Sequence, residues 1–208
     1  MQIFNVSASI RRIVDVAEQF FLIGLYIWFL LRFLPEEFPP QELYTSLILL
    51  SEGVVLVFII CRHRTEKISL SIRDWIIALA GTMTPMLVDK GGELFLPTTG
   101  VTFIFIGFMI HFGAKLSLRR SFGIVPADRG IKCNGLYSFI RHPMYFGYSI
   151  THMGFLLAAP SIWNFTIYCF TWIFLVTRII YEERLLSENP EYIEYRQRVH
   201  YRLIPKLF

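Results

Sequence analysis

A stretch near the middle of the chain has the composition of a small-ligand binding loop. It reads RGIKCNGLYSFIRHPMYFG and spans residues 129–147. Gly130 and Gly135 permit positive φ angles and a close approach of the backbone to a ligand. Taken alone, the stretch fits either a binding loop or an interfacial anchor.

The end of this stretch offers hydrogen-bond donors and flat walls. Arg141 and His142 stand directly before Pro143, and proline is favoured at the first position of a helix. The free N–H groups at such a helix start suit an anionic group such as a carboxylate. Tyr137 and Tyr145 can supply amphipathic walls for a purine or an apolar tail.

A second polar segment, RIIYEERLL at residues 178–186, follows the last apolar block. Arg178 and Glu182 are four residues apart and therefore share one helix face. A surface ion pair at this spacing contributes only about 0.3–0.5 kcal/mol, so stability hardly requires it. If residues 142–177 form a helical hairpin, its two ends are neighbours. His142, Tyr145, Arg178 and Glu182 then surround one pocket at the membrane boundary.

The other polar residues within or beside apolar blocks favour structural roles. Glu52 stands alone, without the partners of a transport pathway, which favours a protonated or helix-paired carboxyl group. Asp15 and Glu18 fit a solvated helix end. His111 and His152 have no Cys or second His three or four residues away, so we expect hydrogen-bonded packing histidines and no metal site.

The composition excludes a soluble or a disordered protein. Of 208 residues, 54% are hydrophobic and 17% charged, and the mean hydropathy is +0.51, whereas soluble domains are about a quarter charged. Cys61, Cys133 and Cys169 include no CxxC pair, which gives neither a disulfide framework nor a zinc site. The start of the chain lacks a signal-peptide pattern, so we expect it to be retained.

The apolar residues gather in long blocks that predict membrane-spanning helices. The last block, residues 142–177, has 36 residues without Asp, Glu, Lys or Arg, too many for one helix of about 20 residues. Pro160 supplies a break, giving a tight hairpin and six spans in all (five to six). The other blocks are residues 20–34, 43–61, 72–88 and 94–114.

Basic residues predict the orientation. The N-terminus, residues 62–73, residues 115–141 and the tail from residue 178 hold 18 of the 20 Lys and Arg residues. The alternate connections at 35–42, 89–93 and 159–161 hold only Lys90. The positive-inside rule then places both termini and both long loops in the cytoplasm. The net charge of +4 therefore serves orientation and contact with anionic lipids, and we expect no nucleic-acid partner.

The C-terminal tail predicts one more helix. Residues 189–205 read NPEYIEYRQRVHYRLIP, with Asn189 as the N-cap and Pro190 at the first helical position. Its tyrosines and arginines suit a helix lying over the pocket or along the bilayer surface. The predicted fold is thus an all-α integral membrane bundle with an amphipathic cytoplasmic tail helix.

The order of these motifs resembles a known family. RHPMYFG, preceded by GLY and followed by R-x-x-x-E-E-x-x-L, Y-x-x-Y-x-x-R-V and RLIP, resembles the isoprenylcysteine carboxyl methyltransferases and the related membrane-embedded phospholipid methyltransferases. The resemblance covers roughly residues 117–208, which we interpret as the methyltransferase region. Residues 1–116 match only as apolar helices and form the remainder of one membrane domain.

The resemblance implies S-adenosylmethionine as the cofactor, bound near the cytoplasmic face. It implies a substrate-side, catalytic role for Arg178 near the reacting carboxylate, and catalytic and cofactor-binding roles for Glu182. The full set of implied cofactor-binding residues is Arg129, Gly130, Ile131, Lys132, Tyr137, His142, Pro143, Met144, Tyr145 and Glu182.

The acceptor remains open at this stage. The resemblance favours carboxyl O-methylation of a lipophilic acceptor, isoprenoid, prenylcysteine-like or another lipid, which reaches the site from the bilayer. N- or S-methylation of a phospholipid or small molecule is the alternative, and a non-catalytic scaffold or transporter is the competing class. The short chain resembles a compact prokaryotic relative of an inner membrane, whereas a eukaryotic chain would belong to the endoplasmic reticulum.

Overall fold

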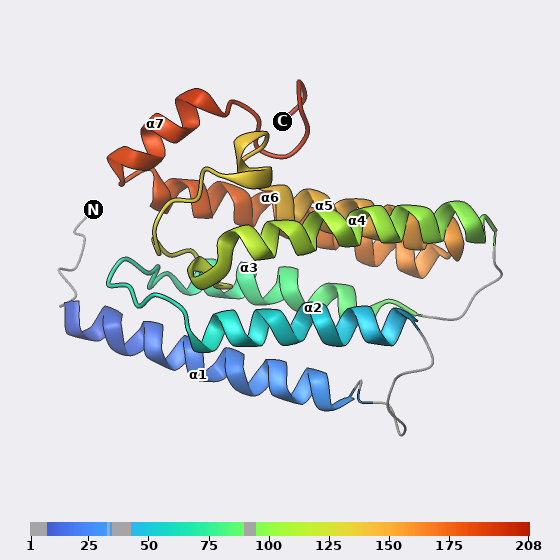
Figure 1. The fold of residues 1–208 in the computed structure, drawn as a ribbon, viewed down its shortest axis with the longest axis horizontal. Helices are drawn as coiled ribbons and strands as arrows, with labels where there is room; N and C mark the ends of the chain where they lie inside the picture. The colour runs from blue at the N-terminus through green and yellow to red at the C-terminus, as the bar shows by residue number, and fades with distance from the viewer. Residues whose placement is uncertain (1–7, 33, 35–42, 90–94) are drawn as a thin grey trace.

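The computed structural model describes residues 8–32, 34, 43–89 and 95–208. Within these ranges the chain is helical, without a regular strand, which confirms the all-α prediction. Six helices lie side by side and a seventh lies across one end of the bundle (Figure 1). They are α1 (Ala8–Arg32), α2 (Leu43–Ile60), α3 (Ile72–Met83), α4 (Pro97–Leu118), α5 (Pro143–Ala158), α6 (Ile162–Leu186) and α7 (Pro190–Arg198).

Among the residues that the structure describes, three of the six predicted spans form helices long and apolar enough to cross a membrane. Ala8–Leu31, Pro97–Ser121 and Ile162–Leu186 are both long and apolar enough to cross. α3 has 12 residues, which is about 18 Å at 1.5 Å per residue, against about 30 Å of hydrocarbon. α5 has 16 residues. The predicted order of six helices is therefore present, and their lengths are unequal.

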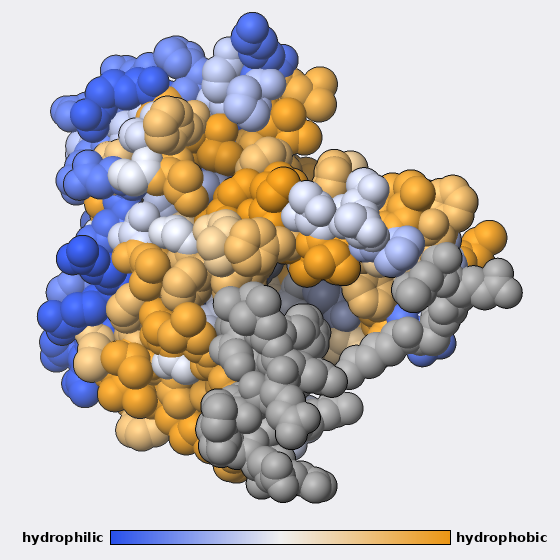
Figure 2. All heavy atoms as spheres, turned by 45° about the vertical axis from the view of Figure 1, so that its right-hand side comes forward, coloured by the Kyte–Doolittle hydropathy of each residue, from blue (hydrophilic) through white to orange (hydrophobic). Residues whose placement is uncertain are grey.

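The surface of the bundle fits a lipid environment. Phe20 on α1, Phe105 on α4 and Phe165 on α6 are at least half exposed. Contiguous exposed apolar surface of this kind marks contact with a membrane or a partner. Figure 2 shows apolar residues over much of the visible face and hydrophilic residues gathered along one side.

α4 and α5 are the most closely packed pair of helices. Gly100 and Gly107 of α4 meet Gly147 and Gly154 of α5: a Cβ added at Gly107 would lie 2.6 Å from the Gly147 carbonyl oxygen. Within membranes, helices associate through such small residues, which let two backbones approach. The seven-residue spacing of the glycines on both helices was the sequence signal for this pair.

The predicted break in the last apolar block is confirmed. The two helices on either side of it, α5 and α6, pack against each other less closely than a tight hairpin implies. α5 ends at Ala158 and α6 begins at Ile162, with the Ser161 hydroxyl oxygen accepting from the Asn164 N–H at 3.3 Å. α5 then packs mainly along α4, whereas α6 packs mainly along α3. The physical reason is that the glycines of α5 face α4.

Two loops and the tail helix meet at one end of the bundle, where α2, α4 and α6 end and α3 and α5 begin (Figure 1). The two loops pair through Ser69 N–H to Pro126 O at 2.9 Å and Asp128 N–H to Lys67 O at 2.8 Å. This is the end predicted to face the cytoplasm. The predicted connection 35–42, and residues 90–93 of the predicted connection 89–93, with Lys90, lie outside the described residues.

The tail helix begins where the sequence predicts and is shorter than predicted: it ends at Arg198, and residues 199–205 of the predicted helix are not helical. α7 begins at Pro190, and the Asn189 side-chain oxygen accepts from the Glu191 N–H at 3.0 Å. Tyr192 and Tyr195 are buried, and the Tyr195 hydroxyl donates to the Tyr137 carbonyl at 2.6 Å. α7 therefore packs against the loop that leads into α5.

Candidate active site

A small cavity lies where α4 ends, α5 begins and α6 ends. Its volume is about 60 Å³. Five of the residues predicted from sequence to form a site line it. Three of the five, His142, Met144 and Tyr145, are the N-cap and first-turn residues of α5. The lining residues are Leu118, Ser121, Gly123, Tyr137, His142, Met144, Tyr145 and Glu182.

The start of α5 positions the cavity's aromatic side. Pro143 is the first residue of α5 and His142 its N-cap, with φ −129° and ψ 58°. The rings of His142 and Tyr145 stack at 5.6 Å between centroids and 12° between planes. The Tyr145 hydroxyl donates to Glu182 Oε2 at 2.9 Å, so this bond joins the start of α5 to the end of α6.

Arg178 lies one turn before Glu182 and is 93% buried. Its guanidinium lies 5.3 Å from the centre of the Tyr145 ring. Its Nη2 donates weakly to the Gly123 carbonyl at 3.4 Å, and its Nε has no hydrogen-bond partner among the described residues. A buried cation normally pairs with an anion, and the described residues supply no ion pair for Arg178.

Glu183 is the centre of a network of ion pairs and hydrogen bonds that the sequence analysis did not predict. It is buried, and its carboxylate lies 2.9 Å from Arg202 Nε, 3.0 Å from Arg141 Nη1 and 3.2 Å from His142 Nε2. The backbone N–H groups of Arg141 and His142 also donate to the C-terminal segment, to Tyr201 O and Arg202 O. Glu183 thus fixes the orientation of His142 at the cavity wall. The adjacent E-E pair was its sequence signal.

Tyr137 forms another wall from the loop before α5. The ring is 93% buried. Burial, followed by the neighbouring Glu182 carboxylate, raises the pKa of the Tyr137 hydroxyl well above its ordinary value. The hydroxyl therefore stays protonated and can act as a hydrogen-bond donor toward the cavity.

The four residues at 129–132 do not line the cavity. Gly130 is exposed, with a positive φ of +90°. Ile131 packs against Tyr192 and Tyr195, and Lys132 is half-buried. The Arg129 guanidinium is buried elsewhere, in an ion cluster.

This ion cluster corrects the prediction that Asp15 and Glu18 form a solvated helix end, because both are almost fully buried. Arg129 Nη2 lies 2.7 Å from Asp15 Oδ1 and 2.7 Å from Glu18 Oε2. Arg62 lies 3.1 Å from Asp15 and 3.0 Å from Glu18. Two loops fold over this face of α1 and remove it from water, which local sequence cannot reveal.

The same cluster holds one wall of the cavity in place. Glu18 Oε1 accepts from the backbone N–H groups of Ile124 at 3.2 Å and Val125 at 3.0 Å. These residues follow Gly123, which lines the cavity and accepts from Arg178. α1 is therefore connected to the candidate site through Glu18.

Glu52, His111 and His152, the other polar residues singled out from the sequence, each contact another side chain. Glu52 pairs with the buried Lys115 at 2.7 Å, which confirms a helix-paired carboxylate. The His111 ring contacts Tyr148 at 4.9 Å between centroids, and His152 stacks on Tyr168 at 4.5 Å. Both histidines pack against aromatic rings, as predicted. The predicted hydrogen bonding is not seen at Nδ1 of either ring, because both atoms are buried without a partner among the described residues.

Two comparisons bear on the fold and the site. Residues 97–191 match the family model described as phospholipid methyltransferase. The solved structure of the eukaryotic intramembrane Ras methyltransferase, isoprenylcysteine carboxyl methyltransferase, aligns at a TM-score of 0.50 with 19% identity, over 94% of this chain and 86% of that one. The chain has the fold of a membrane methyltransferase. A search among curated proteins gives no match.

These findings support an integral membrane methyltransferase, as the motifs implied. The matched range of the family model begins at the first residue of α4 and ends just inside α7. It contains every residue that lines the cavity, as well as Arg178 and Glu183. It does not contain Asp15, Glu18 or Arg62, so the ion cluster joins the matched range to the rest of the chain.

Proposed function

We propose that this methyltransferase uses S-adenosylmethionine to methylate the carboxylate of a lipophilic acceptor. The observation that carries the proposal is Arg178, a buried guanidinium without an ion pair among the described residues, one helical turn from the cavity-lining Glu182. A substrate carboxylate is the anion that a planar guanidinium binds with two parallel hydrogen bonds.

The residues around the cavity fit the proposed cofactor in chemistry. Glu182 has one oxygen engaged by Tyr145 and another available for a hydroxyl or a cation. Leu118 and Met144 supply apolar contacts, and Gly123 contributes its backbone, with the Arg129 guanidinium packed against its Cα. The volume of about 60 Å³ suffices for a few water molecules, so binding of a cofactor requires the surrounding side chains to move apart.

The chain's own residues divide the work between binding and orientation. When bound, the cofactor supplies an activated methyl group on its sulfonium. A carboxylate acceptor is already a nucleophile, so the chain needs no general base, and Arg178 holds the carboxylate in one orientation. Glu183 fixes His142, and the buried Tyr137 and Tyr145 keep water from the reacting groups. The acceptor's apolar tail remains among the lipid-facing helices.

A second candidate is N-methylation of a phospholipid amine, which the family match over residues 97–191 favours. An ammonium group must lose a proton before it can accept a methyl group. Glu182, bonded to the Tyr145 hydroxyl at 2.9 Å, is the nearest candidate base. Amine and carboxylate acceptors are distinguished by supplying each, with the same apolar tail, and identifying the methylated product.

Calorimetric titration with S-adenosylmethionine and S-adenosylhomocysteine tests the cofactor assignment. We expect micromolar binding to the detergent-purified protein and a loss of at least about tenfold in affinity for Glu182→Ala. Glu188→Ala, an exposed carboxylate beyond the end of α6, is the matched control and should bind normally. Absence of binding to folded wild-type protein would refute the proposal and favour a non-catalytic scaffold or a transporter.

A further inference from the structure

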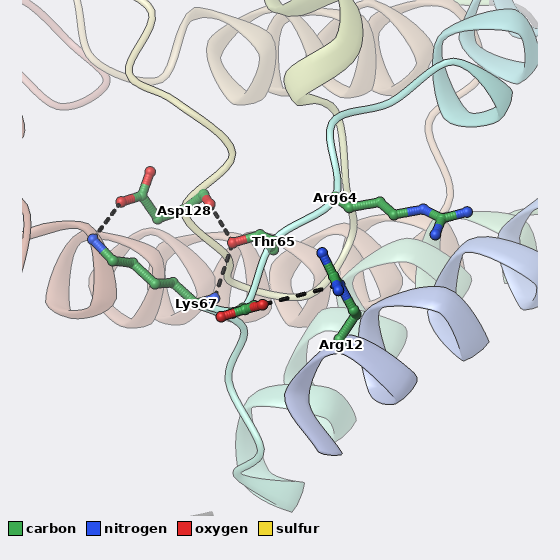
Figure 3. Close-up of a pocket in the computed structure, with 6 residues that line it drawn as sticks. Arg12, Arg64, Thr65, Lys67 and Asp128 are labelled. Atoms are coloured by element: carbon green, nitrogen blue, oxygen red, sulfur yellow. Dashed lines mark hydrogen bonds and ion pairs between the residues drawn. The ribbon is translucent and has the colours of Figure 1, made fainter. Parts of the chain in front are cut away.

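A larger cavity opens on the same end of the molecule, outside the candidate active site. Its volume is about 390 Å³, within the usual range of ligand-binding clefts. It lies between the start of α1 and the two paired loops. Its lining residues are Arg12, Arg64, Thr65, Glu66, Lys67 and Asp128 (Figure 3).

The floor of this cavity is rigid. The Thr65 N–H donates to the buried Asp15 at 3.3 Å, and the Thr65 hydroxyl donates to the Asp128 carbonyl at 2.6 Å. The Lys67 N–H donates back to the Thr65 hydroxyl oxygen at 2.9 Å. The loop that carries Arg64 and Lys67 is therefore held in one conformation above the ion cluster.

The cationic groups around this floor are only loosely engaged. Arg12 lies 4.0 Å from Glu66 and Lys67 lies 3.5 Å from Asp128, and the side chains of Arg12 and Lys67 are each 61% exposed. The Arg12–Glu66 pair is exposed on both sides and contributes little energy. Lys67 is exposed too, and it contacts Asp128, itself 8% exposed, only at the long distance of 3.5 Å. Arg64 is exposed and forms no ion pair within the described ranges. Figure 3 shows Arg12 and Arg64 on one side of Thr65 and Lys67 on the other. All three cations can turn to an anion.

Exposed apolar side chains lie on the same elements as the cations of the cavity, the start of α1 and the ends of the 61–71 loop. Ile10 and Ile13, which flank Arg12 along α1, are 49% and 66% exposed. Ile60 and Ile72, at the two ends of the loop, are 53% and 74% exposed. Exposed isoleucines in these positions suit the acyl region of a bilayer, and the adjacent cations then lie at the level of the head groups.

We propose that this cavity binds the head group of an anionic phospholipid. The phosphate lies among Arg12, Arg64 and Lys67, while the acyl chains run along the exposed isoleucines of α1 and α3. A soluble phosphate would use the cations but gain nothing from the apolar side chains, which is why the combination favours a lipid. The binding site is independent of the methyl-transfer reaction.

Native mass spectrometry of the purified full chain with added phosphatidylglycerol or phosphatidylcholine tests the proposal. We expect at least one retained phosphatidylglycerol, and an affinity at least about tenfold lower in Arg12→Gln/Arg64→Gln/Lys67→Gln, since each basic residue near an anionic group contributes about fivefold. The control variant, Arg196→Gln/Arg198→Gln/Lys206→Gln, removes the same charge from exposed positions of α7 and the tail and should retain the lipid.

Three outcomes would overturn the proposal. Equal retention of phosphatidylcholine would remove the role of head-group charge. Equal loss in both triple variants would indicate general electrostatic attraction without a defined site. Displacement of phosphatidylglycerol by millimolar inorganic phosphate would identify a soluble anion as the ligand.

Discussion

Arg178 is a buried residue whose charge has no ion pair among the described residues. It is buried beneath the Tyr145 ring, and its hydrogen bond to Gly123 is long. Glu183, five residues further along α6, has the opposite situation, since two arginines, Arg141 and Arg202, and the His142 ring surround its carboxylate. The contrast separates a residue that the fold has already satisfied from one suited to binding an anionic substrate.

We expect Arg178→Lys to lower kcat/KM for the acceptor by about 10- to 100-fold, because lysine cannot form the paired hydrogen bonds of a guanidinium. The dissociation constant for S-adenosylhomocysteine should change less than about threefold, which is a smaller effect than the loss of one typical hydrogen bond to the cofactor would cause. Arg184→Lys, an exposed arginine on the same helix, provides the control in the methyl-transfer assay. An unchanged kcat/KM in Arg178→Lys would refute the substrate-side role.

At the scale of elements, two devices hold the candidate site together. The ion cluster joins α1 to the 61–71 loop and to the segment that forms a cavity wall. The glycine contacts between α4 and α5 set the distance between the elements that carry Leu118 and Tyr145. Both sets of contacts connect distant parts of the chain. Substitutions in them should therefore lower the Tm of the protein, and affect methyl transfer only through the loss of folded structure.

Glu18→Gln removes one negative charge from between two buried arginines. Breaking a buried ion pair in this way costs about 3–5 kcal/mol, because a charge is left uncompensated. For a chain of this size we expect the Tm in detergent to fall by roughly 10 °C. Glu66→Gln, in an exposed pair with Arg12, should cost less than about 1 kcal/mol. Equal Tm values for the two variants would contradict the buried cluster.

Gly107→Ala and Gly147→Ala test the contact between α4 and α5. At both positions a Cβ would meet backbone atoms of the facing helix closer than real Cβ atoms approach, and such overpacking costs about 1–3 kcal/mol. Gly24→Ala and Gly53→Ala are matched controls, because nothing lies within 4 Å of a Cβ there. We expect thermal unfolding to show lower Tm values for the first pair and unchanged or higher values for the second.

At the scale of the whole molecule, one end gathers the two paired loops and the tail helix (Figure 1). Both cavities lie at this end, and the face in Figure 2 carries hydrophilic residues along one side. The distribution of basic residues predicts that this end faces the cytoplasm. Cofactor and lipid acceptor would then reach the candidate site from different sides, one from water and the other from the bilayer.

Cys133 can report which side this end occupies. It lies half-buried in the 122–142 loop. In a Cys61→Ser/Cys169→Ser variant, we expect a membrane-impermeant maleimide to label Cys133 in inside-out vesicles and not in right-side-out vesicles. Burial raises the pKa of the Cys133 thiol, and the thiolate is the reactive form. The labelling rate should therefore keep increasing as the pH rises through the usual range for thiols. Labelling from the opposite face would reverse the predicted orientation.

Local sequence determined the helices and much of the cavity. Apolar block lengths and Pro160 marked the helix order, and Asn189 with Pro190 marked the start of α7. Helical periodicity placed Arg178 and Glu182 on one face. The motifs also identified Tyr137, His142, Met144 and Tyr145, all of which line the cavity. These features depend on residues close together in the chain or on a single hairpin.

Only the tertiary structure decided which charges are buried. Asp15 and Glu18 are indistinguishable from a solvated helix end until the loops carrying Arg62 and Arg129 fold over them. Pairing of Glu52 with Lys115 likewise joins residues 63 apart in the chain. The burial of a charge depends on which distant segment covers it. The local sequence pattern reflects hydrophobicity and helical period, so it predicts the helix and not the distant segment that covers it.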